Sequence, residues 1–321
     1  MAMLDATIAR FILVDGGKNM RPTSIVAIIN PISGAGADSD AAARRVALVQ
    51  SEAERRGLSA DIHLTARAGH ARELAASSAA SGVDLVIVWG GDGTLNEAGA
   101  GLIGSSTTLG LVPAGSGNGL AAALGTPREP RAALAAAFDG ETRTIDAGMM
   151  GGRPFFNIAG IGFDARVARL FNARGAGRRG GWPYVLIGIR EGCRYAGAEY
   201  TVELDGDRRR LHALLIAFAN GREYGIGARI APLAQLDDGL LDATIVESRP
   251  LLTRFWDARH LALGQPHNAP SVSVRQVRHA VVDAELPMEF HVDGEPGLTQ
   301  GPVEVRILPG ALKVRSVAPR Q

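Results

Sequence analysis

The chain has little cysteine, few aromatic residues and almost no net charge. Cys193 is its only cysteine, which excludes an internal disulfide and a cysteine-rich metal site. The formal net charge of +1 gives no indication of nucleic acid or of a polybasic membrane segment as a partner. The remaining composition, rich in Ala and Gly with 5% aromatic residues, is typical of an ordinary soluble protein. At 321 residues the chain is long enough for two compact domains.

Long hydrophobic runs are also missing. No apolar stretch approaches the ~20 residues of a membrane-spanning helix, and the N-terminus lacks the layout of a signal peptide. We therefore expect a cytoplasmic protein that meets a membrane only peripherally, at its inner face. Residues 1–19 differ in pattern from the rest of the chain, and Met20 lies just before the first predicted strand. This leader is expected to be a disordered tail, or else translation starts at Met20 rather than at Met1.

Two common glycine-rich nucleotide motifs are absent. The Walker pattern GxxxxGK[ST] occurs nowhere in the chain. The dinucleotide fingerprint GxGxxG fails as well, because Leu120 stands where the third glycine of the segment Gly115–Leu120 belongs. If the chain binds a nucleotide, it uses a different glycine turn.

Such a turn is present in the segment Asp84–Leu102, DLVIVWGGDGTLNEAGAGL. The five apolar residues from Leu85 to Trp89 predict a buried strand, the GGDGT turn ends it, and Asn96 and Glu97 open a helical run. Backbone N–H groups at such a turn can approach a phosphate closely, and the helix dipole favours anions there. The carboxylate of Asp92 is compatible with phosphate only if a divalent cation or a departing proton lies between them. The turn therefore indicates phosphoryl transfer, and the alternative is a turn whose glycines serve packing alone.

The first half of the chain alternates strands and helices, which predicts a parallel α/β sheet. Strands are expected at Ser24–Ile29, Ala60–Leu64, Asp84–Trp89 and Thr108–Val112, with helices that include Asp40–Arg56 and Ala68–Ser81. Glycine-rich or polar loops come after three of these strands, at Asn30–Gly34, Gly90–Thr94 and Pro113–Asn118. Because the carboxyl ends of parallel strands share one edge of the sheet, we expect these loops to converge on one site.

The second half has the texture of an antiparallel β-sandwich, with short apolar runs between Gly, Asp and Pro turns. The runs are Pro154–Ile161, Tyr200–Leu204, Ala213–Ala219, Leu241–Val246, Ala280–Val282 and Val303–Leu308, and one helix is expected near Leu251–Leu263. The predicted organisation is therefore an α/β + β fold: a leader at 1–19, an α/β nucleotide-binding domain at 20–146 and a β-rich domain at 147–321. The active site is expected in the cleft between the two domains.

In its motifs the chain resembles the diacylglycerol kinase catalytic-domain family, which includes bacterial lipid kinases, sphingosine kinases and ceramide kinases. The matching elements are Asn30-Pro31-x-Ser33-Gly34, Thr65 with His70-Ala71, Gly90–Glu97, Pro113–Asn118, Gly160–Asp164, Leu236–Asp242 and Asp293-Gly294-Glu295. They occur in the family's order and span nearly all of Ser24–Val317. A single GGDGT would be weak, since NAD kinases and phosphofructokinases share it, but the full series is specific.

The resemblance implies an ATP- and Mg²⁺-dependent lipid kinase. Its γ-phosphate acceptor would be a hydroxyl of a diacylglycerol-like or of a sphingoid or ceramide-like lipid. The residues that the resemblance places at the nucleotide are Asn30, Pro31, Ile32, Ser33, Gly34, Thr65, Gly90, Gly91, Asp92, Gly93, Thr94, Leu95, Asn96, Glu97, Gly115, Ser116, Gly117, Gly294 and Glu295.

Three acidic residues are candidates for the catalytic base, and the sequence does not choose between them. An alcohol is a poor nucleophile at neutral pH, so a carboxylate within hydrogen-bond reach assists it. The resemblance implies Asp293 or Glu295, and in some family members the role belongs to the residue matching Asp92. The alternative for the triplet Asp293-Gly294-Glu295 is a plain hairpin turn.

Two further sites are implied by the resemblance. Asp164 would contact the lipid head group, or else it is the N-cap of a helix over Ala165–Phe171. The carboxylate of Asp238, with the main-chain carbonyls of Gln235 and Leu240, would hold a second, structural metal ion, or else Asp237-Asp238-Gly239 is a surface turn. The segment Arg174–Tyr184, with its arginines and Trp182, is expected to be a lid over the triphosphate or membrane, or a solvated loop.

The third loop departs from the common bacterial pattern. Pro113–Ala121 carries Ser116 where many bacterial diacylglycerol kinases have Thr, and it looks more like the loop of sphingosine kinases. The acceptor lipid, the choice of ATP or GTP and the oligomeric state stay open, with a homodimer among the options. The rival functions are a soluble-metabolite kinase related to NAD kinases and a module that binds nucleotide or lipid without turnover. The expected partner is a lipid at the membrane surface, with no nucleic acid.

Overall fold

A computed structural model describes residues 22–34, 40–172, 195–224, 229–250, 253, 259–261, 264–285 and 287–317. The predictions for the leader and for Arg174–Tyr184 lie outside these residues, as does most of the helix expected at Leu251–Leu263.

The first half contains strands and helices in alternation, as predicted. They are β1 (Ile25–Ile29), α1 (Ala41–Glu54), β2 (Asp61–Leu64), α2 (His70–Ala80), β3 (Leu85–Gly90), α3 (Asp92–Leu102), β4 (Thr108–Pro113), α4 (Gly119–Ala123) and α5 (Pro130–Asp139). The strands pair in parallel in the spatial order β2-β1-β3-β4. Each of the four lies within one or two residues of its predicted bounds.

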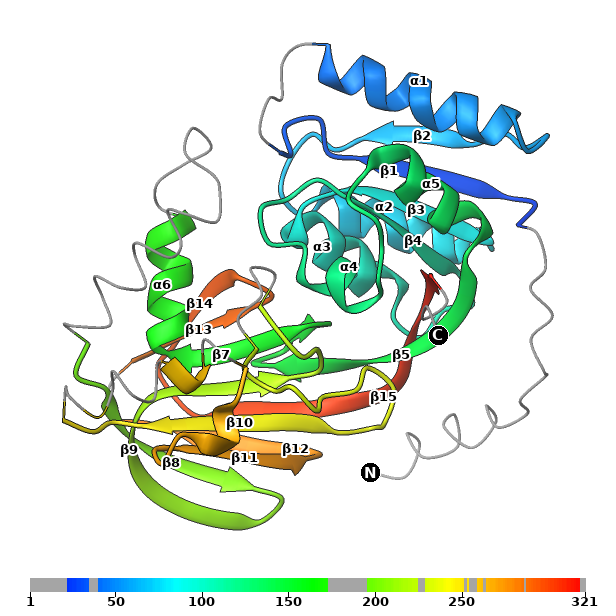
Figure 1. Cartoon of the computed structure of the whole chain (residues 1–321). Coiled ribbons are helices and arrows are strands. Elements are labelled where there is room, and N and C mark those ends of the chain that lie inside the picture. Colours follow the sequence, from blue (N-terminus) through cyan, green and yellow to red (C-terminus); the bar gives the residue numbers. More distant parts are fainter. Residues whose placement is uncertain are drawn as a thin grey trace, which may run out of the picture.

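Helices cover both faces of this parallel sheet (Figure 1). Ile25, Ala27 and Ile29 of β1 pack into one core with residues of α1 and α5. Val26 and Ile28 of the same strand pack into the other core with residues of α2 and α3. All five positions are buried, and for this reason β1 is a continuous apolar run rather than an alternating one.

The second half is built from antiparallel strands around a separate apolar core. Its elements are β5 (Glu141–Met150), β6 (Arg153–Phe155), β7 (Ile158–Gly162), α6 (Phe163–Asn172), β8 (Ala198–Leu204), β9 (Asp207–Ala219), β10 (Leu241–Glu247), the 3₁₀-helix η3 (Pro266–Asn268), β11 (Val272–Val277), β12 (His279–Asp283), β13 (Met288–Val292), β14 (Glu295–Thr299) and β15 (Val303–Ser316). Inward-facing residues of these strands fill a sandwich interior that includes Phe155, Ile216, Phe218 and Phe290. The predicted α/β + β fold is confirmed.

Three predicted strand bounds need correction. The run Ala213–Ala219 is only the last part of β9, which begins at Asp207. The run Pro154–Ile161 is not one strand, because β6 ends at Phe155 and β7 begins at Ile158. The run Val303–Leu308 is only the first part of β15, which continues through a register shift between Leu308 and Leu312. Pro309 and Gly310 interrupt the apolar pattern there, so the sequence signal ends before the strand does.

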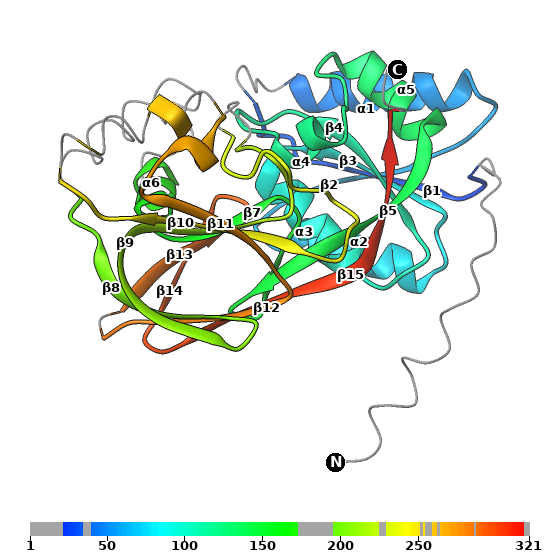
Figure 2. The same cartoon turned by 60° about the horizontal axis from the view of Figure 1, so that its bottom comes forward.

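Strand β15 connects the two halves of the molecule (Figure 2). It pairs antiparallel with β12 and β5, and at Lys313 and Val314 it pairs in parallel with β4. Phe156 fills a second contact between the halves, since it is fully buried against Gly99 of α3. A Cβ at position 99 would lie 2.6 Å from its ring. Burying an aromatic side chain of this kind contributes about 2 kcal/mol.

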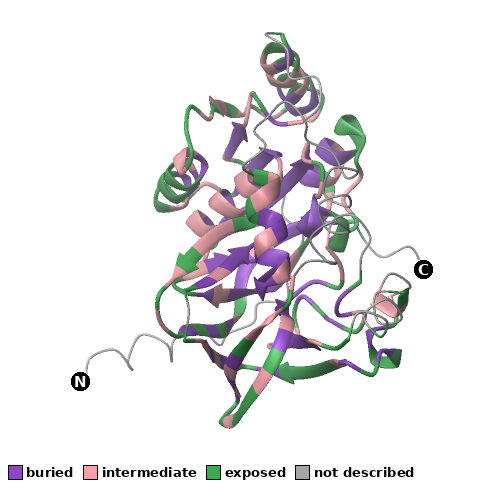
Figure 3. Ribbon diagram, turned by 90° about the vertical axis from the view of Figure 1, so that its left-hand side faces the viewer, coloured by how far each residue is buried: buried purple, intermediate pink, exposed green. Residues whose placement is uncertain are grey.

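Buried residues concentrate along the strands and the inner faces of the helices (Figure 3). None of the helices in the described part of the chain is long and apolar enough to cross a membrane.

Candidate active site

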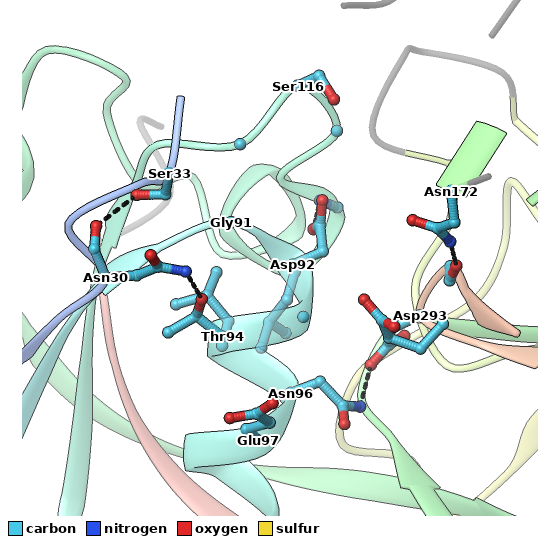
Figure 4. A pocket seen from close by; sticks show the side chains of 18 of the residues that line it. Asn30, Ser33, Gly91, Asp92, Thr94, Asn96, Glu97, Ser116, Asn172 and Asp293 are labelled. Atoms are coloured by element: carbon cyan, nitrogen blue, oxygen red, sulfur yellow. Dashed lines mark hydrogen bonds between the residues drawn. The ribbon is translucent and has the colours of Figure 1, made fainter. Parts of the chain in front are cut away.

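A cavity of about 800 Å³ opens where the three loops of the first half face α6 and the β13–β14 turn of the second (Figure 4). All the residues predicted to contact nucleotide line it except Gly90. Gly90 is the last residue of β3 and packs against the side chain of Thr94. A Cβ added at Gly90 would lie 2.5 Å from the Cβ of Thr94. Gly90 was predicted to contact the nucleotide, but it does not line the cavity; its missing side chain leaves room for Thr94.

The first loop is held by hydrogen bonds from both sides. The Asn30 Nδ2 donates to Thr94 Oγ1 at 2.9 Å, which joins the loop to the start of α3 (Figure 4). From α1, the guanidinium of Arg45 donates to Ser33 Oγ at 3.0 Å and to the Ser33 carbonyl at 2.6 Å. The same guanidinium lies over the ring of Trp89. Sequence reasoning missed Arg45, because no motif contains it.

The second and third loops contact each other through glycine. A Cβ on Gly115 would lie 2.8 Å from the Cα of Gly91, so two backbones approach here as only glycine allows. The two oxygens of Asp92 accept the N–H groups of Asn118 and Gly119, each at 2.8 Å. Burial raises the pKa of Asp92, and these two N–H donors oppose that rise. The Asp92 side chain thus fixes the third loop as well as facing the cavity.

The Asp293 carboxylate is surrounded by donors. Its Oδ1 accepts the N–H groups of Asn157 and Ile158, at 2.9 and 3.1 Å. Its Oδ2 accepts the N–H of Phe156 and the Nδ2 of Asn96, both at 2.9 Å. Burial raises the pKa of Asp293, against the effect of these four donors. With two donors on each oxygen, no acceptor site of the carboxylate is left for a substrate proton.

Asn96 and Glu97 also make structural contacts. The Asn96 Nδ2 donates to Asp293 Oδ2 (Figure 4). It also donates to the carbonyl of Pro154. The Glu97 carboxylate accepts the N–H of Gly69 at 2.7 Å and that of Ala71 at 3.3 Å. Those N–H groups lie at the N-terminus of α2, where a carboxylate is favourable.

Glu295 differs from the other candidate bases. Its side chain is exposed to the cavity and makes no hydrogen bond or ion pair within the described residues. Its Oε1 lies so close to the start of α3 that a Cβ on Gly93 would be 2.6 Å away. The backbone around it is held, since Arg153 Nη1 donates to the Pro296 carbonyl at 2.9 Å. The described part of the chain therefore presents the Glu295 carboxylate to the cavity, without a partner, on a fixed strand end.

Asp164 lies behind the cavity wall rather than in it. Its helix, α6, begins one residue earlier, so Asp164 is not the N-cap. The buried carboxylate accepts Tyr224 Oη and His291 Nε2, both at 3.0 Å, and Tyr224 and His291 line the cavity in its place. Sequence reasoning missed both residues. The only available signal was the position of His291 two residues before Asp293.

The predicted structural metal site lies away from the cavity. Asp238 Oδ1 accepts the N–H of Leu240 at 3.0 Å, and Oδ2 accepts Gln276 Nε2 at 3.4 Å. The neighbouring Asp242 has its pKa raised to about 6, first by burial and then by the charge of Asp238. Two nearby carboxylates are a fitting environment for a divalent cation. Within the described ranges, no three or more His, Cys, Asp or Glu side chains are grouped closely enough to bind a metal ion.

Two family models match consecutive parts of the chain. Residues 24–150 match the family model "Diacylglycerol kinase catalytic domain". Residues 157–316 match the model "YegS C-terminal NAD kinase beta sandwich-like domain".

Curated relatives cover most of the chain. A "Diacylglycerol kinase" of Mycobacterium tuberculosis is 33% identical over 309 residues, which cover 90% of this chain and 94% of the relative. A "Probable lipid kinase YegS-like" of Chromohalobacter salexigens is 33% identical over 255 residues, which cover 78% of this chain and 82% of the relative.

Solved structures support the fold. A diacylglycerol kinase structure from Bacillus anthracis superimposes with a TM-score of 0.70 at 20% identity, covering 93% of this chain and 98% of the other. Together with the two relatives, this confirms the resemblance predicted from the motifs. The chain therefore belongs to the diacylglycerol kinase catalytic-domain family, and it is a lipid kinase.

Proposed function

We propose that this lipid kinase transfers the γ-phosphate of ATP to a hydroxyl of a diacylglycerol-like or of a sphingoid or ceramide-like lipid, with Glu295 as the base. One observation carries the choice of base. The carboxylates of Asp92 and Asp293 are held by two and four donors, whereas that of Glu295 has none among the described residues. A base has to offer a free lone pair to the hydroxyl proton: Asp293 has none left, and Asp92 has fewer than Glu295, whose lone pairs are all free of donors among the described residues.

The nucleotide would lie against the three loops of the first half. The α3 N-terminus at Asp92 and Gly93 offers backbone N–H groups and the positive end of a helix dipole to phosphate. Arg67 and Arg128 also line the cavity. Arg128 is exposed and makes no hydrogen bond or ion pair within the described residues, so its charge is available to a triphosphate. Membership of a kinase family supports ATP as the donor.

Mg²⁺ would be held by the nucleotide phosphates and by one or two carboxylates, which is the usual arrangement for this ion. Asp92 fits that requirement, because it lines the cavity and its carboxylate retains acceptor capacity. When bound, Mg²⁺ would neutralise charge on the transferring phosphoryl group. Glu295 would accept the hydroxyl proton, and the glycine turn would orient the phosphates.

The acceptor lipid would occupy the side of the cavity formed by α6 and the second half. Ala168 and Phe171 of α6 line this side together with Ile158 and Tyr224. These apolar side chains, beside the polar ones of Asn157, Asn172 and His291, suit the glycerol or sphingoid end of a lipid. The enzyme would meet this substrate as a peripheral protein at the cytoplasmic membrane surface.

The test is a radiolabelled ATP/Mg²⁺ assay with mixed micelles of diacylglycerol, monoacylglycerol, sphingosine or ceramide. NAD in detergent-free buffer serves as the soluble acceptor, because the second half matches a sandwich model named after NAD kinase. We expect label on one of the lipids, and its loss in Glu295→Gln. Label on NAD alone would overturn the lipid assignment, and full activity of Glu295→Gln would overturn the choice of base.

A further inference from the structure

The two peptide groups that flank Gly294, the residue before the proposed base, are each held by a hydrogen bond. The Gly294 N–H donates to His291 Nδ1 at 3.2 Å. Its carbonyl accepts Asn172 Nδ2, at the end of α6, at 2.9 Å (Figure 4). Gly294 has φ of +87°, so the backbone here adopts a conformation that L side chains rarely take. The position of Glu295 therefore depends on what fixes these two peptide groups.

The contacts of His291 define its tautomer. The ring is 2% exposed, and both of its nitrogens are within hydrogen-bond distance of a partner. A backbone N–H can only donate, so Nδ1 is the acceptor for Gly294. The neutral ring then carries its proton on Nε2, which donates to Asp164 Oδ2 at 3.0 Å. His291 thus connects a buried carboxylate to the turn that carries Glu295.

Asp164 fixes the far side of the ring. Its carboxylate also accepts Tyr224 Oη at 3.0 Å and the N–H of Ala165 at 2.8 Å, so it is held by a helix, a loop and a strand. Gly160 is required beside it, because an added Cβ there would collide with the carboxylate. The Gly160–Asp164 motif therefore builds the back of this network.

Resting on the proposed function, we propose that His291, oriented by Asp164, is a positioning residue for Glu295. The Nδ1 acceptor fixes the Gly294 peptide, and that peptide sets where the Glu295 carboxylate points. His291 itself takes no proton from substrate, because both ring nitrogens are already bonded. Displacing a catalytic group by about 1 Å can lower a rate ~10²-fold. Losing this acceptor should therefore lower kcat and leave the nucleotide loops undisturbed.

Two substitutions separate the two ends of the ring. In His291→Asn the amide oxygen can stand near the Nδ1 position and accept from Gly294. In His291→Gln the amide nitrogen can reach the Nε2 position and donate to Asp164, but no acceptor remains for Gly294. We expect His291→Gln to lower kcat on the labelled lipid by ~10- to 100-fold with KM for ATP within about 3-fold. His291→Asn should retain kcat within about 5-fold, although both variants lose one buried hydrogen bond.

A readout without catalysis accompanies the kinetics. We expect hydrogen exchange of the Gly294 amide, followed by NMR, to be faster in His291→Gln than in the wild type or in His291→Asn. His279→Gln is the matched control, because His279 is a partly exposed histidine of β12 outside the cavity, and it should change neither kcat nor this amide. Equal kcat losses with equal Gly294 exchange in the Asn and Gln variants would overturn the proposal. If the wild type labels no lipid, the proposed function fails, while the exchange experiment still decides the positioning role.

Discussion

Two glycine turns, one from each half of the molecule, place acidic residues at the same cavity but use them differently. In the GGDGT turn, both oxygens of Asp92 accept backbone N–H groups that fix the third loop. In the Asp293-Gly294-Glu295 turn the first acid accepts four donors and the second accepts none within the described residues. Acidic residues of one motif can therefore have different roles. A carboxylate that already accepts several donors holds the fold together, and one that accepts none is available to a substrate.

The largest expected effect is on turnover in Glu295→Gln. The substitution keeps the shape of the side chain but removes its ability to accept the hydroxyl proton, so we expect kcat to fall ~10²- to 10⁴-fold. The melting temperature should stay within about 2 °C, because the Glu295 carboxylate has no hydrogen bond to lose within the described residues. Micelle kinetics and thermal melts measure the two quantities. Glu304→Gln, an exposed carboxylate of β15 outside the cavity, is the control and should retain full activity.

Asp293→Asn, unlike Glu295→Gln, should lower the stability of the fold. An amide NH₂ would face donors that now bond to an oxygen, which leaves buried N–H groups unpaired at ~1–3 kcal/mol each. We expect the free energy of unfolding to fall by about 3 kcal/mol in urea denaturation. An unchanged urea midpoint in this variant would contradict the structural role given to Asp293.

Asp92→Asn should affect both nucleotide binding and stability. One of its oxygens becomes an NH₂ that cannot accept from Asn118 or Gly119, so the third loop loses an anchor. We expect KM for ATP to rise ~10-fold and the free energy of unfolding to fall by ~1–2 kcal/mol. Initial-rate kinetics at several ATP concentrations would reveal the change. A loss confined to kcat, as large as that of Glu295→Gln, would favour Asp92 as the base.

Asp84 has a carboxylate that is held by several donors and lies outside the cavity. Its Oδ2 accepts the N–H and hydroxyl of Thr23 and the N–H of Ser24, and the Thr23 N–H contributes most to lowering its pKa to about 2. Because the folded pKa is depressed, the stabilisation is full above pH ~4 and is lost as the pH falls toward 2.

Asp84→Asn should therefore lower the free energy of unfolding at pH 7 by about 1 kcal/mol, since the site is exposed and screened by solvent. The difference from the wild type should shrink between pH 4 and pH 2, as urea titrations at each pH would measure. Lipid phosphorylation should not change. A constant difference across this range would show that the carboxylate charge is not what stabilises the fold there.

The sequence predicted the first half better than the second for a physical reason. Strands of the parallel sheet are buried on both faces, so β1 and β3 are unbroken apolar runs that end at glycine or polar loops. Strands β5, β11, β13 and β14 were not predicted. Strand β11 is largely exposed and β14 partly exposed, and polar or charged residues interrupt β5 and β13, so none of the four is an unbroken apolar run. The sequence did not predict the break between β6 and β7 either. The chain leaves the sheet there because the N–H groups of Phe156 and Asn157 donate to the side chain of Asp293, which is distant in the sequence.

The sequence by itself determined the order of the motifs, the two-part fold and the three glycine-rich or polar loops that meet at the cavity. These follow from local chemistry: apolar runs form strands, glycine turns end them, and parallel strands bring their loops to one edge. Only the tertiary structure decided which carboxylates are already bonded. The donors that bind Asp293 lie 135 to 197 positions away in the chain, and those that bind Asp92 lie 26 and 27 positions away. Hydrogen-bond saturation depends on atoms brought together by packing, and no local pattern in the sequence records it.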